Sequence, residues 1–117
     1  DPENLIVVYD DIDLPFGTIK VSKDRGSGGH NGIRSIEKYL KSRTFIRFRV
    51  GVCPVDEQGT PRKPLSHGDV SRYLVHKQLS QKNLDVYVHI SDQVFRSLQM
   101  IACQGLSHAM QQINTHK

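Results

Sequence analysis

The chain has 117 residues, of which 37% are hydrophobic and 24% are charged, and its formal net charge at pH 7 is +4. This balance predicts one modest globular domain over residues 1–117, because a disordered chain would carry fewer apolar residues. No apolar run reaches the length of about 18 residues that a membrane span needs, so we expect no membrane partner. Cys53 and Cys103 lie far apart and outside any cysteine and histidine cluster, so we expect no metal, no cofactor and no disulfide framework.

The charges are distributed unevenly along the chain. Residues 1–17 contain five acidic residues and no lysine or arginine, whereas residues 18–49 contain nine lysines and arginines against two acidic residues. A local excess of seven positive charges is typical of a surface that binds phosphate groups. A solvated surface with unevenly scattered charges is the alternative interpretation, because a basic patch alone is weak evidence.

The first predicted elements are two strands separated by an acidic turn. Residues 5–9 form an apolar run rich in β-branched residues, which predicts a strand buried on both faces of a sheet. Since the chain lacks an initiator Met and enters this run almost at once, we expect it to be a fragment without its N-terminal part. The acidic residues 10–13 with Pro15 and Gly17 then predict a turn, and the alternation over residues 18–23 predicts a half-exposed strand.

A glycine-rich loop over residues 24–29 leads into a predicted helix. His30 and Asn31 stand at its start, and the helix is expected to end near Ser42. The apolar residues that recur at helical spacing, and are expected to face the core, are Ile33, Ile36, Tyr39 and Leu40.

The next strand is predicted over residues 45–52 by strict alternation of apolar and basic residues. Arg47 and Arg49 share one face, which indicates either an edge strand or a binding surface. Residues 54–69 then lack apolar periodicity and contain several prolines and glycines, so we expect a flexible connection or lid there.

Helices are predicted for the remainder of the chain. After a short apolar stretch over residues 73–75, an amphipathic helix is expected from about Gln81 to Ile101, with Gly105 as its stop, followed by a short final helix with apolar residues at 106, 109, 110 and 113. The stripe of the long helix, predicted to be core, consists of Leu84, Val88, Ser91, Phe95, Leu98 and Ala102. This order of elements predicts an α/β fold with a mixed sheet flanked by helices.

The glycine loop is the most informative segment. Its glycines allow positive φ and close approach of a ligand to the main chain, and the free N–H groups at the following helix start attract anions. The residues after Gly32 do not fit the phosphate-binding motif of nucleotide-binding loops, which requires Lys followed by Ser or Thr. A plain turn is an equally good interpretation of the loop taken alone.

Three ordered blocks make the pattern specific. Residues 9–17 (YDDIDLPFG), 26–36 (GSGGHNGIRSI) and 45–52 (FIRFRVGV) closely resemble the signatures H-D-E-L-D-L-P-x-G, G-G-x-G-G-H-N-G-L-R-S-I and F-x-R-L-R-I-G-I of the bacterial-type peptidyl-tRNA hydrolases, here the C-terminal part of such a chain. Tyr9 replaces the usual His and Asp11 the usual Glu. The resemblance implies a three-layer fold that hydrolyses the ester between peptide and tRNA, in the cytoplasm or in an organelle, with peptidyl-tRNA as partner and a monomer as the expected state.

The resemblance also implies roles for individual residues. Asp10 matches the carboxylate that orients the catalytic His, while that His belongs to an N-terminal block absent from this sequence, so we expect the chain alone to be inactive. Asn31 matches a substrate-binding amide, and Gly29 and His30 lie beside it in the same block; His30 is either a supporting hydrogen-bonding residue or a structural one. The expected contacts to tRNA phosphates are Lys20, Lys23 and Arg49, with Ser22 standing where many members have Lys.

Two other functions fit the same sequence. A non-enzymatic RNA-binding relative is one, since plant organelle splicing factors use this fold without the activity. A phosphate-binding domain unrelated to tRNA is the other. The presence or absence of the catalytic His in an N-terminal extension separates the first alternative from the enzyme.

Overall fold

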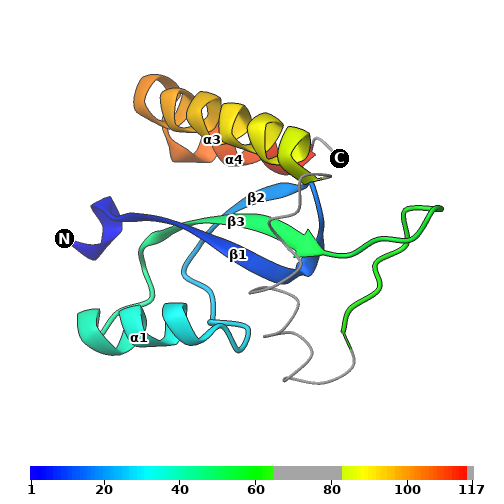
Figure 1. The fold of residues 1–117 in the computed structure, drawn as a ribbon. Helices are drawn as coiled ribbons and strands as arrows, with labels where there is room; N and C mark the ends of the chain where they lie inside the picture. The colour runs from blue at the N-terminus through cyan, green and yellow to red at the C-terminus, as the bar shows by residue number, and fades with distance from the viewer. Residues whose placement is uncertain (65–82, 116–117) are drawn as a thin grey trace.

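The computed structural model describes residues 1–64 and 83–115 and shows a three-layer arrangement (Figure 1). A short helix η1 (Pro2–Asn4) precedes strands β1 (Ile6–Pro15) and β2 (Ile19–Lys23), helix α1 (Asn31–Leu40), strand β3 (Ile46–Cys53) and helices α3 (Leu84–Gln104) and α4 (Leu106–Thr115). The strands form one sheet in the order β1-β3-β2, with β1 parallel and β2 antiparallel to β3. Helices α3 and α4 cover one face of the sheet and α1 covers the other. The predicted mixed sheet flanked by helices is confirmed.

The face of the sheet toward α3 and α4 forms the apolar core. Val21, Ile46 and Phe48 are buried there at the centre of the sheet. The partly buried residues that pack against them from β1 and the two C-terminal helices are Ile6, Val94, Ile101, Leu106, Met110 and Ile113. The apolar half of the alternation in β3 therefore faces this core, as predicted.

The opposite face of β3 carries two arginines that are buried rather than offered to solvent. Arg47 is 0% exposed and Arg49 is 8% exposed, because β3 is the central strand and α1 closes over this side. The expectation that these arginines mark an edge strand or a binding surface is therefore wrong. Each is buried together with a carboxylate partner, Glu37 for Arg47 and Asp11 for Arg49, which compensates the loss of hydration.

Strand β1 differs from its prediction in length and in burial. It continues through the acidic residues to Pro15, where a turn was predicted, and its register against β3 shifts between Asp11 and Pro15. Among the described strands it pairs only with β3, so Val8 remains 49% exposed and the predicted burial on both faces is wrong. Gly51 permits the close crossing at the end of β1, since a Cβ there would overlap the carbonyl oxygen of Pro15.

Helix α1 begins as predicted, and of the four residues expected to face the core only Tyr39 is exposed. His30 is its N-cap, and Lys41 ends the helix in the left-handed conformation with φ of 53°. Ile33 is buried, whereas Tyr39 is 87% exposed, contrary to the prediction for that residue. Glu37 takes the inward position on the helix instead, because the buried Arg47 requires a carboxylate.

The largest discrepancy concerns the long helix. All six residues of the stripe predicted to be core, from Leu84 to Ala102, are exposed, and the helix buries Ile90 and Ser97 against the sheet instead. The predicted start near Gln81 lies outside the described residues, while Gly105 ends α3 as predicted. The helix carries apolar residues on two sides, and periodicity alone does not tell which side packs against the sheet, so the predicted core side is wrong.

Within residues 54–64 the chain extends away from the end of β3 and turns back at a loop held by Asp56 (Figure 1). Asp56 accepts hydrogen bonds from the backbone N–H groups of Gln58 and Thr60 and from the Arg62 side chain, and Val55 forms a β-bridge with Pro61. The rest of the predicted flexible connection and the apolar stretch 73–75 lie outside the described residues. No helix in residues 1–64 and 83–115 is both long and apolar enough to cross a membrane.

Candidate active site

A cavity of about 350 Å³ lies between the C-terminal half of β1 and the glycine loop. Its walls come from residues 9–13 of β1, residues 25–32 of the loop and the start of α1, and Lys63 of the following turn. The residues that line it are Tyr9, Asp10, Asp11, Ile12, Asp13, Arg25, Gly26, Ser27, Gly28, Gly29, His30, Asn31, Gly32 and Lys63. The structure thus brings the first two sequence blocks, separated by a whole strand, to one place.

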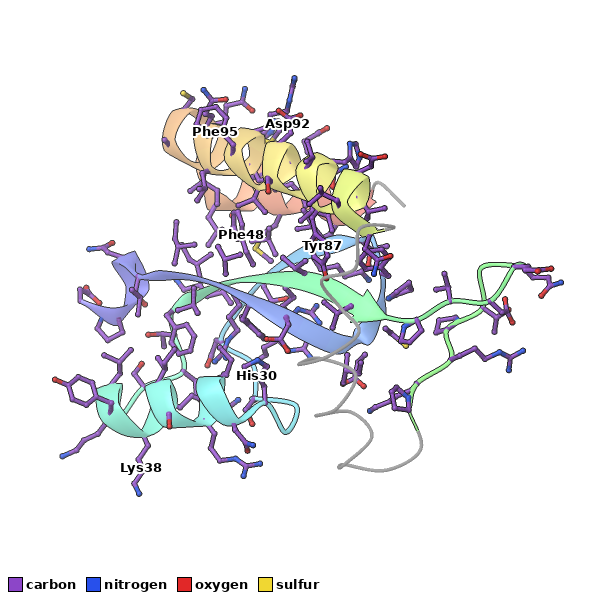
Figure 2. The ribbon with its side chains drawn as sticks, in the orientation of Figure 1. His30, Lys38, Phe48, Tyr87, Asp92 and Phe95 are labelled. Atoms are coloured by element: carbon purple, nitrogen blue, oxygen red, sulfur yellow. The ribbon has the colours of Figure 1, made fainter. Side chains whose placement is uncertain are left out.

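Asp10 and His30 form a direct pair in this cavity. His30 Nε2 lies 2.9 Å from Asp10 Oδ1, and both side chains are partly exposed. Figure 2 shows His30 projecting from the start of α1 toward the sheet. The N-cap position of His30 therefore fixes the carboxylate of Asp10 in one orientation.

The hydrogen bonds of His30 determine its tautomer. The backbone N–H of Ile33 donates to His30 Nδ1 at 3.2 Å, so Nδ1 must be unprotonated and act as an acceptor. Nε2 then carries the proton, and this N–H donates a hydrogen bond to Asp10 Oδ1. Both ring nitrogens are engaged, which makes His30 at once a structural helix cap and a support for Asp10 and leaves it no free lone pair to act as a base.

The other two acidic residues of β1 have partners of their own. Asp11 Oδ2 accepts a hydrogen bond from Arg49 Nη1 at 3.2 Å, and the same guanidinium donates through Nε to Ser22. Asp13 Oδ1 accepts from Lys63 Nζ at 2.7 Å, and this hydrogen bond raises the pKa of Lys63. An acidic run can remain within one strand because each carboxylate meets a different basic or imidazole group.

Tyr9 connects the cavity to the buried arginine layer. Its ring meets the His30 ring edge to face, with 5.1 Å between centroids. Burial raises the pKa of the Tyr9 hydroxyl, and the nearby positive charge of Arg47 acts in the opposite direction. Tyr9 is therefore a neutral wall of the cavity near pH 7, where the family signature has a His.

The glycine loop places Asn31 at the open side of the cavity. Gly28 and Gly29 adopt φ of 61° and 84°, a backbone conformation that favours glycine. Asn31 is the first residue of α1 and is exposed, and its side chain makes no hydrogen bond to a described residue. A Cβ at Gly32 would lie 3.0 Å from His30 Cε1, so this glycine leaves room for the ring that holds Asp10. The N–H groups of Gly29, His30 and Ile33 are already bonded within the loop and the cap, so the Asn31 amide and the backbone N–H groups of Asn31 and Gly32 are the donors that can receive a polar ligand here.

The structure separates the three expected phosphate contacts. In the register of the sheet Lys20 lies opposite Arg49, on the α1 side, and is exposed. Lys23 lies opposite Ile46, on the α3 side, and its ammonium group is 3.8 Å from Glu3. Arg49 is buried and bound to Asp11, so it is not placed to meet a phosphate from solvent.

Several residues that line the cavity were given no role by sequence reasoning, among them Tyr9, Arg25 and Lys63. Arg25 and Tyr9 lie within or next to the recognised blocks and could have been found from that position. Lys63 contacts Asp13 across 50 residues of sequence, and nothing in the sequence signals that contact. Among the described residues no three His, Cys, Asp or Glu side chains gather in a way that could hold a metal ion.

Comparison with known proteins assigns the family. The model of the family described as "Peptidyl-tRNA hydrolase" matches residues 1–117. The chain is 39% identical to a peptidyl-tRNA hydrolase of Pelobacter propionicus over 109 residues, which are 93% of this chain and 51% of that protein. It is 37% identical to one of Geotalea daltonii over 112 residues, which are 96% of this chain and 53% of that protein.

Solved structures agree with the sequence comparison. The crystal structure of peptidyl-tRNA hydrolase from Acinetobacter baumannii superposes with a TM-score of 0.78 at 27% identity, covering 99% of this chain and 54% of that one. The chain therefore spans about half the length of the relatives it matches. With the whole of its length inside the family model, the chain belongs to the peptidyl-tRNA hydrolase family.

Proposed function

We propose that this chain supplies the C-terminal half of an enzyme that hydrolyses the ester bond between a peptide and tRNA. The observation that carries the proposal is the Asp10 and His30 pair at the mouth of the glycine loop, 2.9 Å between Nε2 and Oδ1, inside a cavity that also contains Asn31. The relatives that are 37% and 39% identical to this chain are named peptidyl-tRNA hydrolases.

Asp10 acts as an orienting carboxylate in this proposal. His30 holds one of its oxygens, Oδ1, and the other, Oδ2, has no hydrogen bond to any described residue. That free oxygen can accept the N–H of an imidazole, hold the ring in the correct tautomer and stabilise its protonated form. His30 is the one histidine among the described residues of the cavity, and both its nitrogens are engaged. The imidazole base is therefore expected from outside the described residues, in line with the N-terminal block that the family resemblance implies.

Asn31 and the start of α1 would hold the ester. An amide side chain offers both a donor and an acceptor, so Asn31 can bind the terminal ribose or the attacking water. Backbone N–H groups at a helix start stabilise negative charge that develops on the ester oxygen during attack. Gly28 and Gly29 have no side chains to block the approach of the substrate.

The tRNA phosphates would meet the exposed cations around the cavity. Lys20 lies on the same side of the sheet as α1, and Arg25 and Lys63 line the cavity itself. Arg49 would act indirectly, because its buried guanidinium donates hydrogen bonds to the side chains of Asp11 and Ser22 and so fixes their positions. Lys23 would contribute to the positive potential rather than to the cavity, because it lies on the opposite side of the sheet. Binding is then expected to weaken as salt rises.

A non-enzymatic RNA-binding role is the second candidate. It is favoured by one observation, that no histidine with a free ring nitrogen lines the cavity among the described residues. The two candidates predict the same dependence of tRNA binding on salt. They differ only in turnover by the complete protein.

The test is release of labelled peptide from peptidyl-tRNA under single-turnover conditions. We expect the complete reading frame that contains these residues to cleave the ester, and the 117-residue chain alone to be nearly inactive. Asp10→Asn in the complete protein should lower the rate by roughly 10²–10⁴-fold with little change in tRNA binding. Asp85→Asn, an equivalent change on the exposed side of α3, is the matched control and should leave the rate unchanged.

Each outcome separates the candidates. A complete protein that binds tRNA without cleaving it would support the RNA-binding role. Robust turnover by the 117-residue chain would contradict the assignment of the base to an external segment. Equal rates for wild type and Asp10→Asn would remove Asp10 from the mechanism.

A further inference from the structure

The His30 ring is held by two hydrogen bonds that run in the plane of the ring. The N–H of Ile33 lies 3.2 Å from Nδ1, and Nε2 lies 2.9 Å from Asp10 Oδ1. Such bonds tolerate a departure of about 30° from linearity, so they determine the tautomer but oppose a tilt of the ring only weakly. A tilt carries Nε2 away from Asp10, because Nε2 is at the far end of the ring. The direction of the Asp10 carboxylate therefore depends on what lies against the ring.

The Tyr9 ring supplies that contact. Its centroid is 5.1 Å from the centroid of the His30 ring, and the two planes make an angle of 73°, so the rings meet edge to face. Aromatic pairs favour this arrangement at such a separation. The His30 ring also lies close to the backbone at Gly32, where an added Cβ would be 3.0 Å from Cε1 and 3.3 Å from Nδ1. Tyr9 and Gly32 thus confine the ring where the hydrogen bonds do not.

Tyr9 is itself held by the sheet. It pairs with Arg49 in the register of β1 and β3, so its side chain leaves the sheet on the side of the two buried arginines. Burial raises the pKa of the Tyr9 hydroxyl while the charge of Arg47 acts to lower it, so a neutral phenol lies near that guanidinium. Arg47 is 0% exposed, and its Nε and Nη1 have no hydrogen-bond partner among the described residues, so a nearby oxygen stabilises it. Tyr9 therefore has a fixed place from which its ring supports His30.

The same arginine holds helix α1. Arg47 Nη2 donates to Glu37 Oε1 at 3.2 Å, and Glu37 follows His30 by seven residues, which is close to two turns of a helix. His30 and Glu37 therefore lie on the side of α1 that faces the sheet. Arg47 fixes the middle of the helix through Glu37, and Tyr9 meets the residue that caps its start.

We propose that Tyr9 is a positioning residue of the candidate active site, because its ring keeps the His30 imidazole in the orientation in which Nε2 meets Asp10 Oδ1. The position of Asp10 Oδ2, which makes no hydrogen bond to a described residue, is set in this way. The inference rests on the proposed hydrolysis, in which Oδ2 orients the base. Tyr9 acts through His30 and not on the reacting atoms. Its ring carries the effect rather than its hydroxyl, since the contact with His30 is between the two rings.

The test compares Tyr9→Leu with Tyr9→Phe in the complete protein. Tyr9→Leu removes the ring and should lower kcat for peptidyl-tRNA cleavage at least roughly tenfold, with KM changed by less than about twofold, because a misplaced orienting group affects turnover and not binding. Tyr9→Phe keeps the ring and should stay within about threefold of the wild-type kcat. Tyr39→Leu, the same change at a tyrosine that is 87% exposed on α1, is the matched control and should equal wild type.

A double-mutant cycle tests whether Tyr9 acts through His30. The ring is absent in His30→Ala, so adding Tyr9→Leu should lower kcat by less than a further factor of about two. A full tenfold loss in that background overturns the proposal. A Tyr9→Phe protein as slow as Tyr9→Leu also overturns it, and this conservative variant keeps the test decisive if Tyr9→Leu does not fold.

Nitrogen NMR of the histidine-labelled complete protein tests the ring contact without turnover. In wild type the two nitrogens of His30, identified by their loss in His30→Ala, should give the well-separated signals of one fixed tautomer. In Tyr9→Leu these signals should move toward each other as the ring moves and the tautomers exchange, whereas in Tyr9→Phe they should keep their places. Unchanged signals in Tyr9→Leu overturn the proposal. A complete protein that shows the expected signals but cleaves no peptidyl-tRNA would contradict the proposed hydrolysis while supporting the contact between Tyr9 and His30.

Discussion

The two faces of the sheet are built from opposite chemistry although they share one strand. Toward α3 and α4, β3 presents Phe48 to an apolar core. Toward α1 it presents Arg47 and Arg49, which are buried with Glu37 and Asp11. Alternation along a strand gives both faces from one sequence, so a single strand carries the core and the polar layer that leads to the cavity.

The two faces contribute differently to the protein. Apolar burial is favourable wherever the shapes fit, whereas a buried arginine is tolerated only while its partner remains in place. Arg47 illustrates this dependence: it stacks on Phe45 at 4.0 Å and bonds Glu37, yet its Nε and Nη1 have no hydrogen-bond partner among the described residues. Substitutions on the α1 face are thus expected to be tolerated less well than substitutions of similar size on the apolar face. The α1 face also supports the candidate active site.

The largest effect is expected on the apolar face. Phe48→Ala should lower the free energy of unfolding by about 3–5 kcal/mol, because it removes a fully buried ring at the centre of the sheet. Phe95→Ala, which removes the same side chain from the exposed side of α3, should cost less than about 1 kcal/mol in dilute solution. Urea denaturation of both variants checks the contrast, and equal losses would contradict the assigned core.

The next effect tests the polar face. Glu37→Ala should cost about 3 kcal/mol, because it leaves Arg47 charged, buried and without its carboxylate. The double variant Glu37→Leu with Arg47→Met should recover most of that loss, since an apolar pair of similar size avoids the desolvation of two charges. A double variant as unstable as Glu37→Ala would show that the attraction between Glu37 and Arg47 holds α1 to the sheet, and that the loss in Glu37→Ala is not only the cost of an unpaired buried charge.

A smaller effect is expected at the edge of the polar layer. His30→Ala removes the N-cap of α1 and the partner of Asp10, and should cost about 1 kcal/mol. His89→Ala on the exposed side of α3 is the control and should change stability by less than about 0.5 kcal/mol. Thermal unfolding measures both, and identical midpoints would mean that the Asp10 and His30 pair contributes nothing to the fold.

The smallest perturbation is chemical labelling of the two thiols. Cys53 is buried, and burial raises its pKa, whereas Cys103 is exposed on α3. Under native conditions Cys53 should react with a thiol reagent about a hundredfold more slowly than Cys103. In Cys103→Ser the fast phase should disappear. A rapid reaction of Cys53 would show that this end of β3 opens readily to solvent.

Local sequence signals predicted the main secondary-structure elements that form both faces of the sheet. The alternation over residues 45–52 predicted β3, the pair His30 and Asn31 predicted the start of α1, and Gly105 predicted the end of α3, because each depends on neighbours within a few residues. The site followed from the same blocks, since the cavity combines the acidic strand with the glycine loop.

What depended on distant partners could not be predicted. The acidic residues after Tyr9 remain in a strand only because Arg49, His30 and Lys63 meet them from three other segments. Tyr39 is exposed because the inward place on α1 goes to the partner of Arg47. On α3, two apolar sides compete for the sheet, and the choice depends on packing that periodicity does not contain.

The most direct test of the central claim is the pH dependence of single-turnover peptide release by the complete protein, wild type against Asp10→Asn. A carboxylate beside an imidazole stabilises the protonated ring and raises its pKa, so its removal should lower the pKa of the catalytic base. We therefore predict a slower reaction whose acidic limb moves to lower pH in Asp10→Asn. An acidic limb at the wild-type position, or a rate equal to wild type, would contradict the account that Asp10, held by His30, orients the base.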